Sequence, residues 1–409
     1  MTSDVILDRV RAAPRRTRRS GMTPARAAAI AGIALGLLAF FVTLPPIELR
    51  TAVPSYLLAV AGAALGAVAI RGGERRTGWF AVVACAGGAA GAYAAVHSGV
   101  SNLETVVSWG ALTAAALRFA TPLTFAALGG LVSERAGVVN IALEGMMLMG
   151  AFFGIWGADV TGSWLAGLLI GVAAGAALAL VHAVFAITLR ADQIVSGFAL
   201  NIVALGLTGY MYIDTYGEQG TPDDVPAIPD VHLPIKSVPF FGDAFGQLNI
   251  LVWVSLLMVV VLWVLIFRTP TGLRLRSVGE NPRAAETVGI SVYAVRYAAV
   301  IASGALAAAG GAFLSIGFVH SFSQNMTAGR GFIALAALIF GRWRPFGLLG
   351  ATLLFGFSSA LAQRLPTFSP STATLFQALP YVLTLIAVAG VIGRSVPPAA
   401  AGRPYSRED

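Results

Sequence analysis

Long apolar segments alternate with short polar ones along most of the chain. All but one of the apolar segments are close to the ~17 to 25 residues that a helix needs to cross a bilayer, and we count about twelve segments, with ten or eleven as alternatives. The predicted spans are 27–44, 53–70, 80–96, 114–132, 137–156, 165–189, 194–213, 250–267, 298–318, 331–340, 346–361 and 374–392. The pattern predicts an all-α polytopic membrane protein.

The tenth apolar segment, 331–340, is too short to cross by itself. It crosses if residues 328–342 form one helix. Otherwise it is a broken or re-entrant helix, which membrane proteins tolerate where the backbone is buried in protein or lines a cavity. The expected fold class therefore includes one or more broken or re-entrant helices.

Arginine is concentrated in alternate connections between the apolar segments. The first 26 residues, the turn at 71–76, the segment 268–296 and the chain end are rich in arginine, whereas 214–249 carries six acids and one lysine. Positive residues are retained on the cytoplasmic side of membranes. We expect both termini in the cytoplasm and 214–249 outside.

Composition excludes several classes of protein. The chain has 409 residues, of which 57% are hydrophobic and 11% charged, whereas about a quarter are charged in a soluble domain. The net charge of +8 lies between the spans, so we expect no nucleic acid partner. Lys236 follows no glycine-rich loop, which excludes a P-loop and its ATP hydrolysis. With Cys85 as the single cysteine, neither an intrachain disulfide nor a thiolate cluster can form.

The charged segment 268–296 contains signals for a short helix. Asn281 is a good N-cap, Pro282 suits the first helical position and Gly289 suits the stop, so the pattern predicts a helix over about Pro282 to Val288. Helices below ~12 residues barely form alone in water. We expect something to pack against this helix, with a solvated connecting loop as the alternative.

Three polar residues inside predicted spans are candidates for a translocation path. Asn140 and Glu144 are four residues apart, which would place them on one helical face, with Glu144 about 10 Å inside the span. Asn201 lies within a later span. Each could contact a solute or bond neighbouring helices, and Arg118 and Arg135 are candidate ion-pair partners of Glu144. The sequence offers no catalytic constellation and no metal site, since its four histidines fall in different segments.

The first 102 residues differ from the rest. A basic tail precedes three glycine- and alanine-rich spans that lack an evident functional group, which suggests a packing or assembly appendage. We expect a division into residues 1–102, a core of 103–393 and a cytoplasmic tail of 394–409. The glycine pairs that are spaced for close helix contact are Gly32 and Gly36, Gly62 and Gly66, and Gly87 and Gly91.

Three strings resemble the permease subunits of ABC importers of the ribose and simple-sugar type, in particular the nucleoside-associated branch. They are LRFATPLTFAALGGLVSERAGVVNIALEGMMLMGAF, TGLRLRSVGENPRAAETVGISV and GRGFIALAALIFGRWRPFG. The resemblance covers about residues 103–393. It implies that the short helix is the coupling helix, which docks in a groove of the ATP-hydrolysing subunit. Its residues are Gly279, Glu280, Asn281, Pro282, Arg283, Ala284, Ala285, Glu286 and Gly289.

The resemblance also implies a complex in a bacterial plasma membrane. Its other members are an ATP-binding cassette ATPase that holds ATP and Mg, a second and related permease chain, and an external substrate-binding lipoprotein that meets the loop 214–249. No cofactor is expected in this chain. The pattern departs from the family in its first hundred residues. A second departure is Arg342 and Arg344, which bracket Trp343 where many relatives have glycine before the tryptophan, so this turn is expected in the cytoplasm.

The leading hypothesis is therefore a permease subunit that imports nucleosides or related sugar-like solutes, with ATP hydrolysed in a partner. Ribose-type sugars and branched-chain amino acids are the alternative solutes. A proton-coupled secondary transporter, in which Glu144 carries the proton, and a membrane scaffold without solute flux are the alternative classes.

Overall fold

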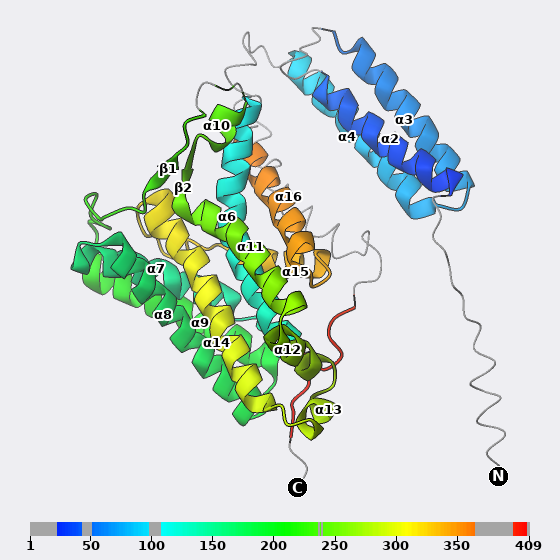
Figure 1. Ribbon diagram of the computed structural model, residues 1–409. Helices are drawn as coiled ribbons and strands as arrows, with labels where there is room; N and C mark the ends of the chain where they lie inside the picture. The colour runs from blue at the N-terminus through cyan, green and yellow to red at the C-terminus, as the bar shows by residue number, and fades with distance from the viewer. Residues whose placement is uncertain are drawn as a thin grey trace, which may run out of the picture. The chain divides into compact units, whose positions relative to one another are not determined.

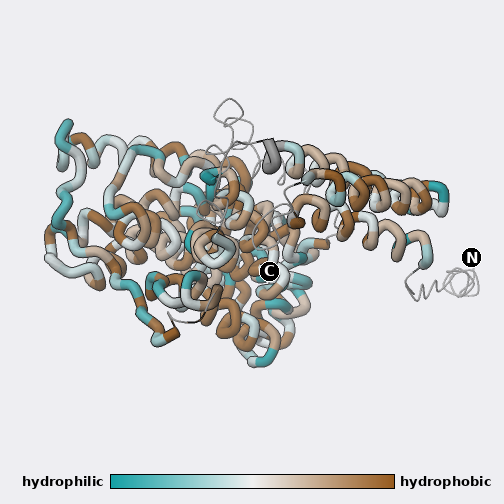
Figure 2. The backbone as a smooth tube through the Cα atoms, turned by 90° about the horizontal axis from the view of Figure 1, so that it is seen from above, coloured by the Kyte–Doolittle hydropathy of each residue, from teal (hydrophilic) through white to brown (hydrophobic). Residues whose placement is uncertain are grey.

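The computed structural model describes residues 23–42, 51–97, 108–235, 238, 240–364 and 396–406, and it divides the chain into two compact units, Met1–Glu104 and Thr105–Asp409. In the described residues, eight helices are long and apolar enough to cross a membrane, and two other apolar helices are shorter. Apolar residues dominate these helices, as Figure 2 shows. The chain is thus a helical multi-pass membrane protein. The predicted number of about twelve spans is not confirmed, and the span 374–392 lies outside the described residues.

The first unit consists of helices α2 (Pro24–Phe41), α3 (Val53–Arg71) and α4 (Arg75–His97), each of which packs on the other two (Figure 1). Gly32, Gly36, Gly62 and Gly66 lie at these contacts, where a Cβ would overlap a neighbouring helix. The prediction is wrong for Gly87, which faces open space; the adjacent Gly88 contacts the backbone of α2 instead.

The second unit contains the predicted core. Its elements in chain order are α6 (Trp109–Arg135), α7 (Leu143–Thr161), α8 (Trp164–Ala183), the π-helical turn η1 (Val184–Thr188), α9 (Gln193–Tyr216), β1 (Asp230–His232), α10 (Phe241–Phe245), β2 (Gln247–Asn249), α11 (Ile250–Arg268), α12 (Pro270–Glu280), α13 (Pro282–Thr287), α14 (Val292–Ala312), the π-helical stretch η2 (Phe313–Val319), α15 (Arg330–Phe340) and α16 (Pro345–Arg364).

Helix α6 is the centre of this unit, because it packs on α14, α15 and α16 and buries nearly all of its length. It begins where the Ser108 hydroxyl donates to Asp243 of α10. It ends where Gly279 of α12 packs on the carbonyl of Arg135. These contacts define two opposite ends of the unit, called here the α10 end and the α13 end (Figure 1).

Helices α7, α8 and α14 approach one another through small residues. The buried face of α8 includes a stripe of small residues, which are Gly167, Gly171, Gly175 and Ala179. A Cβ on Gly171 would lie 2.7 Å from the carbonyl oxygen of Gly150 in α7. Small residues allow such backbone proximity and so favour helix association in lipid. The opposite face of α8 is apolar and exposed, as suits a helix that meets the bilayer.

Two parts of the second unit have structure that the sequence reading did not anticipate. The segment 214–249 contains an antiparallel pair of short strands, in which Val231 of β1 lies opposite Leu248 of β2. Helix α12 precedes the predicted short helix. Thr269 caps α12 and Pro270 occupies its first turn, so a recognisable start signal was present.

Candidate functional site

The segment between α6 and α7 is irregular, with turns at residues 136–137 and 141–142, and most of it is buried in the protein. Helix α7 begins at Leu143, so the predicted span 137–156 is wrong in its first turns. Asn140 precedes the helix and does not share a helical face with Glu144. Asn140 donates to the hydroxyl of Ser303, the twelfth residue of the long helix α14, at 2.9 Å. The start of α7 is therefore near the middle of α14 and away from both of its ends.

Residues 138–142 belong to neither helix, and several of their backbone polar groups are bonded by side chains. An unsatisfied backbone group within the hydrocarbon region costs several kcal/mol, so irregular backbone must find partners in the protein. The bonds are Ser133 Oγ to Val138 O at 2.7 Å, Val139 N to Gln193 Oε1 at 2.8 Å, His182 Nε2 with Val139 O at 3.1 Å, Asn201 Nδ2 to Ile141 O at 3.0 Å and Ala142 N to Asn140 Oδ1 at 3.1 Å.

Glu144 joins the starts of two helices. Its carboxylate, in the first turn of α7, accepts from the backbone amides of Gly329 at 2.8 Å and Gly331 at 2.5 Å, which form the start of α15. A carboxylate at a helix N-terminus satisfies amides that lack intrahelical partners and opposes the positive end of the helix dipole. Among the described residues it makes no ion pair with Arg118 or Arg135, so these predicted partners are wrong. Arg118 donates to Gln247 O and Arg135 to Trp343 O.

Helix α15 is of half length, which confirms the expectation of a broken helix. Its 11 residues extend about 16 Å, roughly half of the ~30 Å hydrocarbon core. It runs from the junction with Glu144 to the α13 end. There, a turn with positive φ at Arg342 and Trp343 follows, and the Trp343 indole donates to the buried carboxylate of Glu134 at 2.6 Å. The Arg135 side chain also donates to Trp343 O, at 2.6 Å, so two side chains at the end of α6 hold this turn.

The three candidate path residues are thus brought together around residues 140–145. Asn201 from α9 accepts from the amide of Gly145 at 2.7 Å, beside the bonds of Asn140 and Glu144. All three side chains are buried, and each bonds protein groups. We call residues 140–145 and 329–331, together with Asn201, the central junction. It holds the starts of α7 and α15 against each other.

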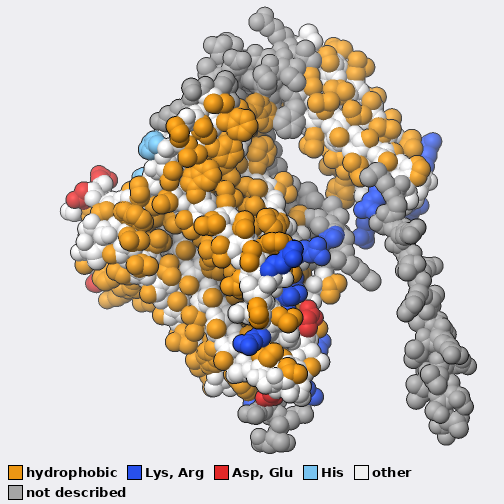
Figure 3. Space-filling model, in the orientation of Figure 1, with side chains coloured by type: hydrophobic (Ala, Val, Ile, Leu, Met, Phe, Trp, Pro, Cys, Tyr) orange, Lys and Arg blue, Asp and Glu red, His pale blue; other side chains and the backbone are white. Residues whose placement is uncertain are grey.

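The predicted short helix is confirmed as α13, Pro282–Thr287. The Asn281 side chain caps it by accepting from the amide of Ala284 at 3.1 Å, and Gly289 ends it with φ +81°. Ala285 is 3% exposed, whereas Ala284 and Val288 are exposed, Val288 by 73%. Basic side chains gather on the molecule around α12 and α13 (Figure 3). The helix therefore has one buried face and one face that remains open.

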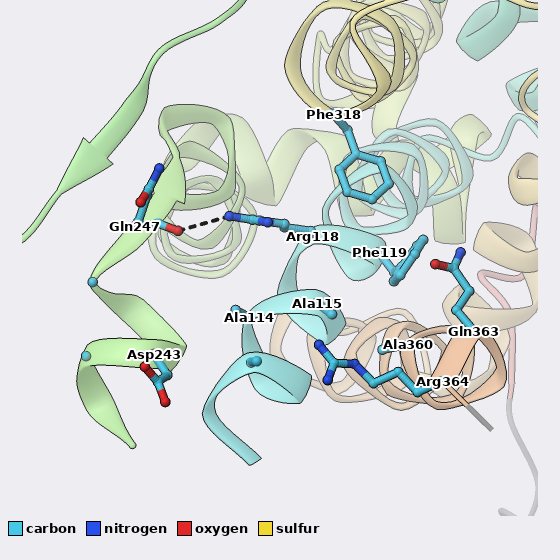
Figure 4. A pocket seen from close by; sticks show the side chains of 13 residues that line it. Ala114, Ala115, Arg118, Phe119, Asp243, Gln247, Phe318, Ala360, Gln363 and Arg364 are labelled. Atoms are coloured by element: carbon cyan, nitrogen blue, oxygen red, sulfur yellow. Dashed lines mark hydrogen bonds between the residues drawn. The ribbon is translucent and has the colours of Figure 1, made fainter. Parts of the chain in front are cut away.

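A cavity of 710 Å³ lies at the α10 end, among α6, α10, η2 and α16 (Figure 4). Phe119 and Phe318 line it with their rings edge to face at 5.3 Å. Arg118, Asp243 and Gln363 contribute polar groups. This volume falls within the ~300 to 1,000 Å³ of small-molecule sites, which also combine apolar walls with a few polar groups.

Several of these contacts could not be assigned from the sequence. Gln193 and His182 were not predicted as site residues, but they bond the backbone of a segment that is more than forty residues away. Trp343 was named for its flanking arginines, and its partner Glu134 was not predicted. The available signal was that polar residues are rare in apolar helices. This signal indicates which positions matter but does not indicate which residues they bond.

The second unit is thus a multi-pass helical unit in which two helices start in the interior and a short capped helix lies at one end. Residues 112–388 match the family model described as branched-chain amino acid transport system / permease component, and the chain belongs to this family. No solved structure matches the chain.

Named relatives cover most of the second unit. The guanosine ABC transporter permease protein NupQ of Bacillus subtilis is 43% identical over 71% of this chain and 95% of its own length. The nucleoside ABC transporter permease protein NupC of Lactococcus lactis is 40% identical over 71% and 94%. The putative glucose ABC transporter permease protein TsgC13 of Haloferax volcanii is 39% identical over 62% and 78%.

Proposed function

We propose that this chain is a permease subunit of an ABC importer for nucleosides. The observation that carries the proposal is the 43% identity to a guanosine permease over 95% of that protein. It is supported by α13, a capped helix with one open face at the arginine-rich end of the unit. Ribose-type sugars and branched-chain amino acids are less favoured as solutes, since the two most identical of the relatives above are named for nucleosides or guanosine.

The complex that we propose contains three kinds of subunit besides this chain. An ATPase subunit holds ATP and Mg, and a substrate-binding lipoprotein meets the α10 end from outside. The second permease is a related chain: Lactococcus lactis also has the nucleoside permease NupB, which is 26% identical to this chain, beside NupC at 40%. The complex lies in a bacterial plasma membrane. The positive charge around α12 and α13 favours a cytoplasmic position for the α13 end.

Within this complex we assign α13 to ATPase coupling. The open face, with Ala284 and Val288, is the docking surface, because an exposed apolar side chain outside the bilayer gains most from a partner. Ala285 and Glu286 lie on the other side: Ala285 is buried, and Glu286 accepts from the hydroxyl of Tyr405. Substitutions at Ala285 or Glu286 therefore disturb contacts within the chain as well as docking.

For the solute, we propose that the cavity at the α10 end is the first contact within this chain. Its aromatic edges suit a nucleobase, and its polar groups suit the hydroxyls of ribose. The central junction lies deeper. There Asn140, Glu144 and Asn201 fix the starts of α7 and α15. Movement of these two helix starts would open the translocation path. In this proposal, movement of α13 on ATP hydrolysis moves the membrane helices that pack together, and this movement produces alternating access.

The geometry of Glu144 disfavours the proton-coupled alternative. Both carboxylate oxygens accept from backbone amides, which are donors only. A protonated carboxyl group would replace one acceptor by a donor and lose one of these bonds. Glu144 is therefore better suited to hold α15 than to bind and release a proton on each cycle.

Uptake of radiolabelled guanosine in cells that express the complete transporter tests the proposal. We expect accumulation that stops on ATP depletion or on deletion of the ATPase subunit and continues when a protonophore is added together with an ATP-regenerating supply. Accumulation that ends with the protonophore but survives loss of the ATPase would contradict it. Competition by unlabelled ribose or leucine, without competition by nucleosides, would contradict the assigned solute class.

A further inference from the structure

The chain's last described segment, residues 396–406, lies on α12 and α13 (Figure 1, red trace beside α13). Ala400 N donates to the carbonyl oxygen of Gly279 at 2.9 Å. Ala399 N donates to Glu280 Oε2 at 3.3 Å. These bonds attach the segment to the end of α12, directly before the N-cap of α13. We call residues 396–406 the strap.

Tyr405 of the strap connects three elements. It is 6% exposed and packs with Val278 of α12, Ala285 of α13 and Val292 of α14 in one apolar cluster. Its hydroxyl donates to the carboxylate of Glu286 in α13. Tyr405 thus contacts the face of α13 that is turned away from the open side.

Arg296 in α14 is buried beneath the strap. Arg296 is 1% exposed. Its Nη1 donates a hydrogen bond to Arg403 O of the strap at 3.2 Å. The guanidinium carbon of Arg296 lies 5.9 Å from the centre of the Tyr405 ring. Its Nε and Nη2 have no hydrogen-bond partner among the described residues. Burying a guanidinium is costly unless nearby groups compensate for lost water. The strap and the base of α14 therefore depend on each other.

The covalent link between α13 and α14 is a short turn. It consists of residues 288–291, in which Gly289 N donates to Glu286 O at 2.8 Å and Ile290 N donates to Ala285 O at 3.0 Å. Along the backbone, movement of α13 reaches α14 through this turn. The strap contacts both helices and so adds a second attachment.

We propose that the strap is this second attachment, and that Tyr405 is a positioning residue that passes the movement of α13 to α14. The inference rests on the proposed docking of an ATPase at α13 and deepens it. The chain's own carboxyl-terminal segment covers one face of the coupling helix, and the ATPase meets the other.

The test uses the full transporter in proteoliposomes and measures ATP hydrolysed per guanosine imported. Tyr405→Ala removes the ring and the hydroxyl, whereas Tyr405→Phe keeps the ring. Tyr297→Phe is the matched control, because it removes a tyrosine hydroxyl on α14 that bonds Thr188 and not the strap. We expect Tyr405→Ala to raise the ratio at least about fivefold, a common size for coupling between sites, with the ATPase still bound. Tyr405→Phe should give a smaller rise, and the control should match wild type.

A ratio for Tyr405→Ala equal to that of wild type would overturn the inference. Absence of ATP-dependent uptake in the wild-type complex would instead contradict the proposed function, so the two failures are distinguishable.

A tether keeps the inference testable even where Tyr405→Ala folds poorly. In a chain with Cys85→Ala, Glu280→Cys and Ala399→Cys are joined by a short bismaleimide. If strap and helix move as one body, the tethered transporter imports guanosine at the untethered rate. Loss of uptake on tethering would show that the strap must detach and would overturn the proposal.

Discussion

The backbone amide of Gly331 donates to the carboxylate of Glu144 across 2.5 Å, and this bond joins the first turns of two helices that start inside the protein. One is the beginning of α7 and the other the beginning of the half-length α15. Two positive helix ends meet at this point, and Glu144 lies between them with its negative charge.

Removing that charge should loosen the central junction. Glu144→Gln keeps one acceptor oxygen but turns an amide donor toward the amides of Gly329 and Gly331. Hydrogen bonds to charged groups contribute about 1.5 to 3 kcal/mol, so we expect a loss of that order in the free energy of unfolding. Thermal unfolding of the purified permease in detergent measures it. Glu218→Gln, at an exposed acid in the loop after α9, is the matched control. Equal unfolding midpoints for both variants would contradict the role of Glu144.

The contact between the two helix starts also excludes a side chain at residue 331. A Cβ on Gly331 would lie 2.5 Å from the backbone nitrogen of Glu144, closer than atoms approach without overlap. Gly331→Ala should therefore reduce uptake and unfolding temperature, although alanine is the better helix former. Gly350→Ala is the control, since Gly350 in α16 has open space around it. A Gly331→Ala protein that is as stable as wild type would show that α15 does not press on α7.

Asn201 should be needed for the irregular segment before α7. Asn201→Ala removes the acceptor of Gly145 N and the donor to Ile141 O, and leaves both backbone groups buried. Each such group costs about 1 to 3 kcal/mol. We expect a marked drop in the unfolding midpoint, while Gln219→Ala, at an exposed position in the loop after α9, leaves it unchanged. A similar midpoint for both variants would mean that other groups satisfy the segment.

Sequence reasoning located the membrane helices and the cap of α13, because both depend on local signals. Each membrane helix is apolar along its whole length and can be recognised from its own residues. Asn281 and Pro282 are adjacent in sequence to the helix that they start. Sequence reasoning failed at residues 138–142, because an apolar irregular segment and an apolar helix have similar sequences. The residues that decide between them, Gln193 and Asn201, come from a different helix. The strap was missed for the same reason, since nothing around Tyr405 in the sequence indicates α13 as its partner.

Filling the cavity at the α10 end should block transport without harming the fold. Ala115 lines this cavity, and tryptophan in its place would occupy much of the volume shown in Figure 4. We expect Ala115→Trp to abolish guanosine uptake while the ATPase still co-purifies. Leu169→Trp, on the exposed face of α8, is the control for the size of the side chain. Normal uptake by Ala115→Trp would exclude the cavity from the solute's route.

The measurement that tests the account most directly concerns Val288, an apolar residue at the end of α13 whose side chain is 73% exposed. Val288→Asp places a charge on the open face and leaves the strap contacts in place. We expect guanosine uptake to fall at least about tenfold, which corresponds to ~1.4 kcal/mol of lost interaction, and the ATPase to be lost on purification. Val288→Thr, which keeps the side-chain shape and adds no charge, should keep most of the uptake. If Val288→Asp retains both the ATPase and full uptake, α13 is not the site through which the ATPase subunit acts.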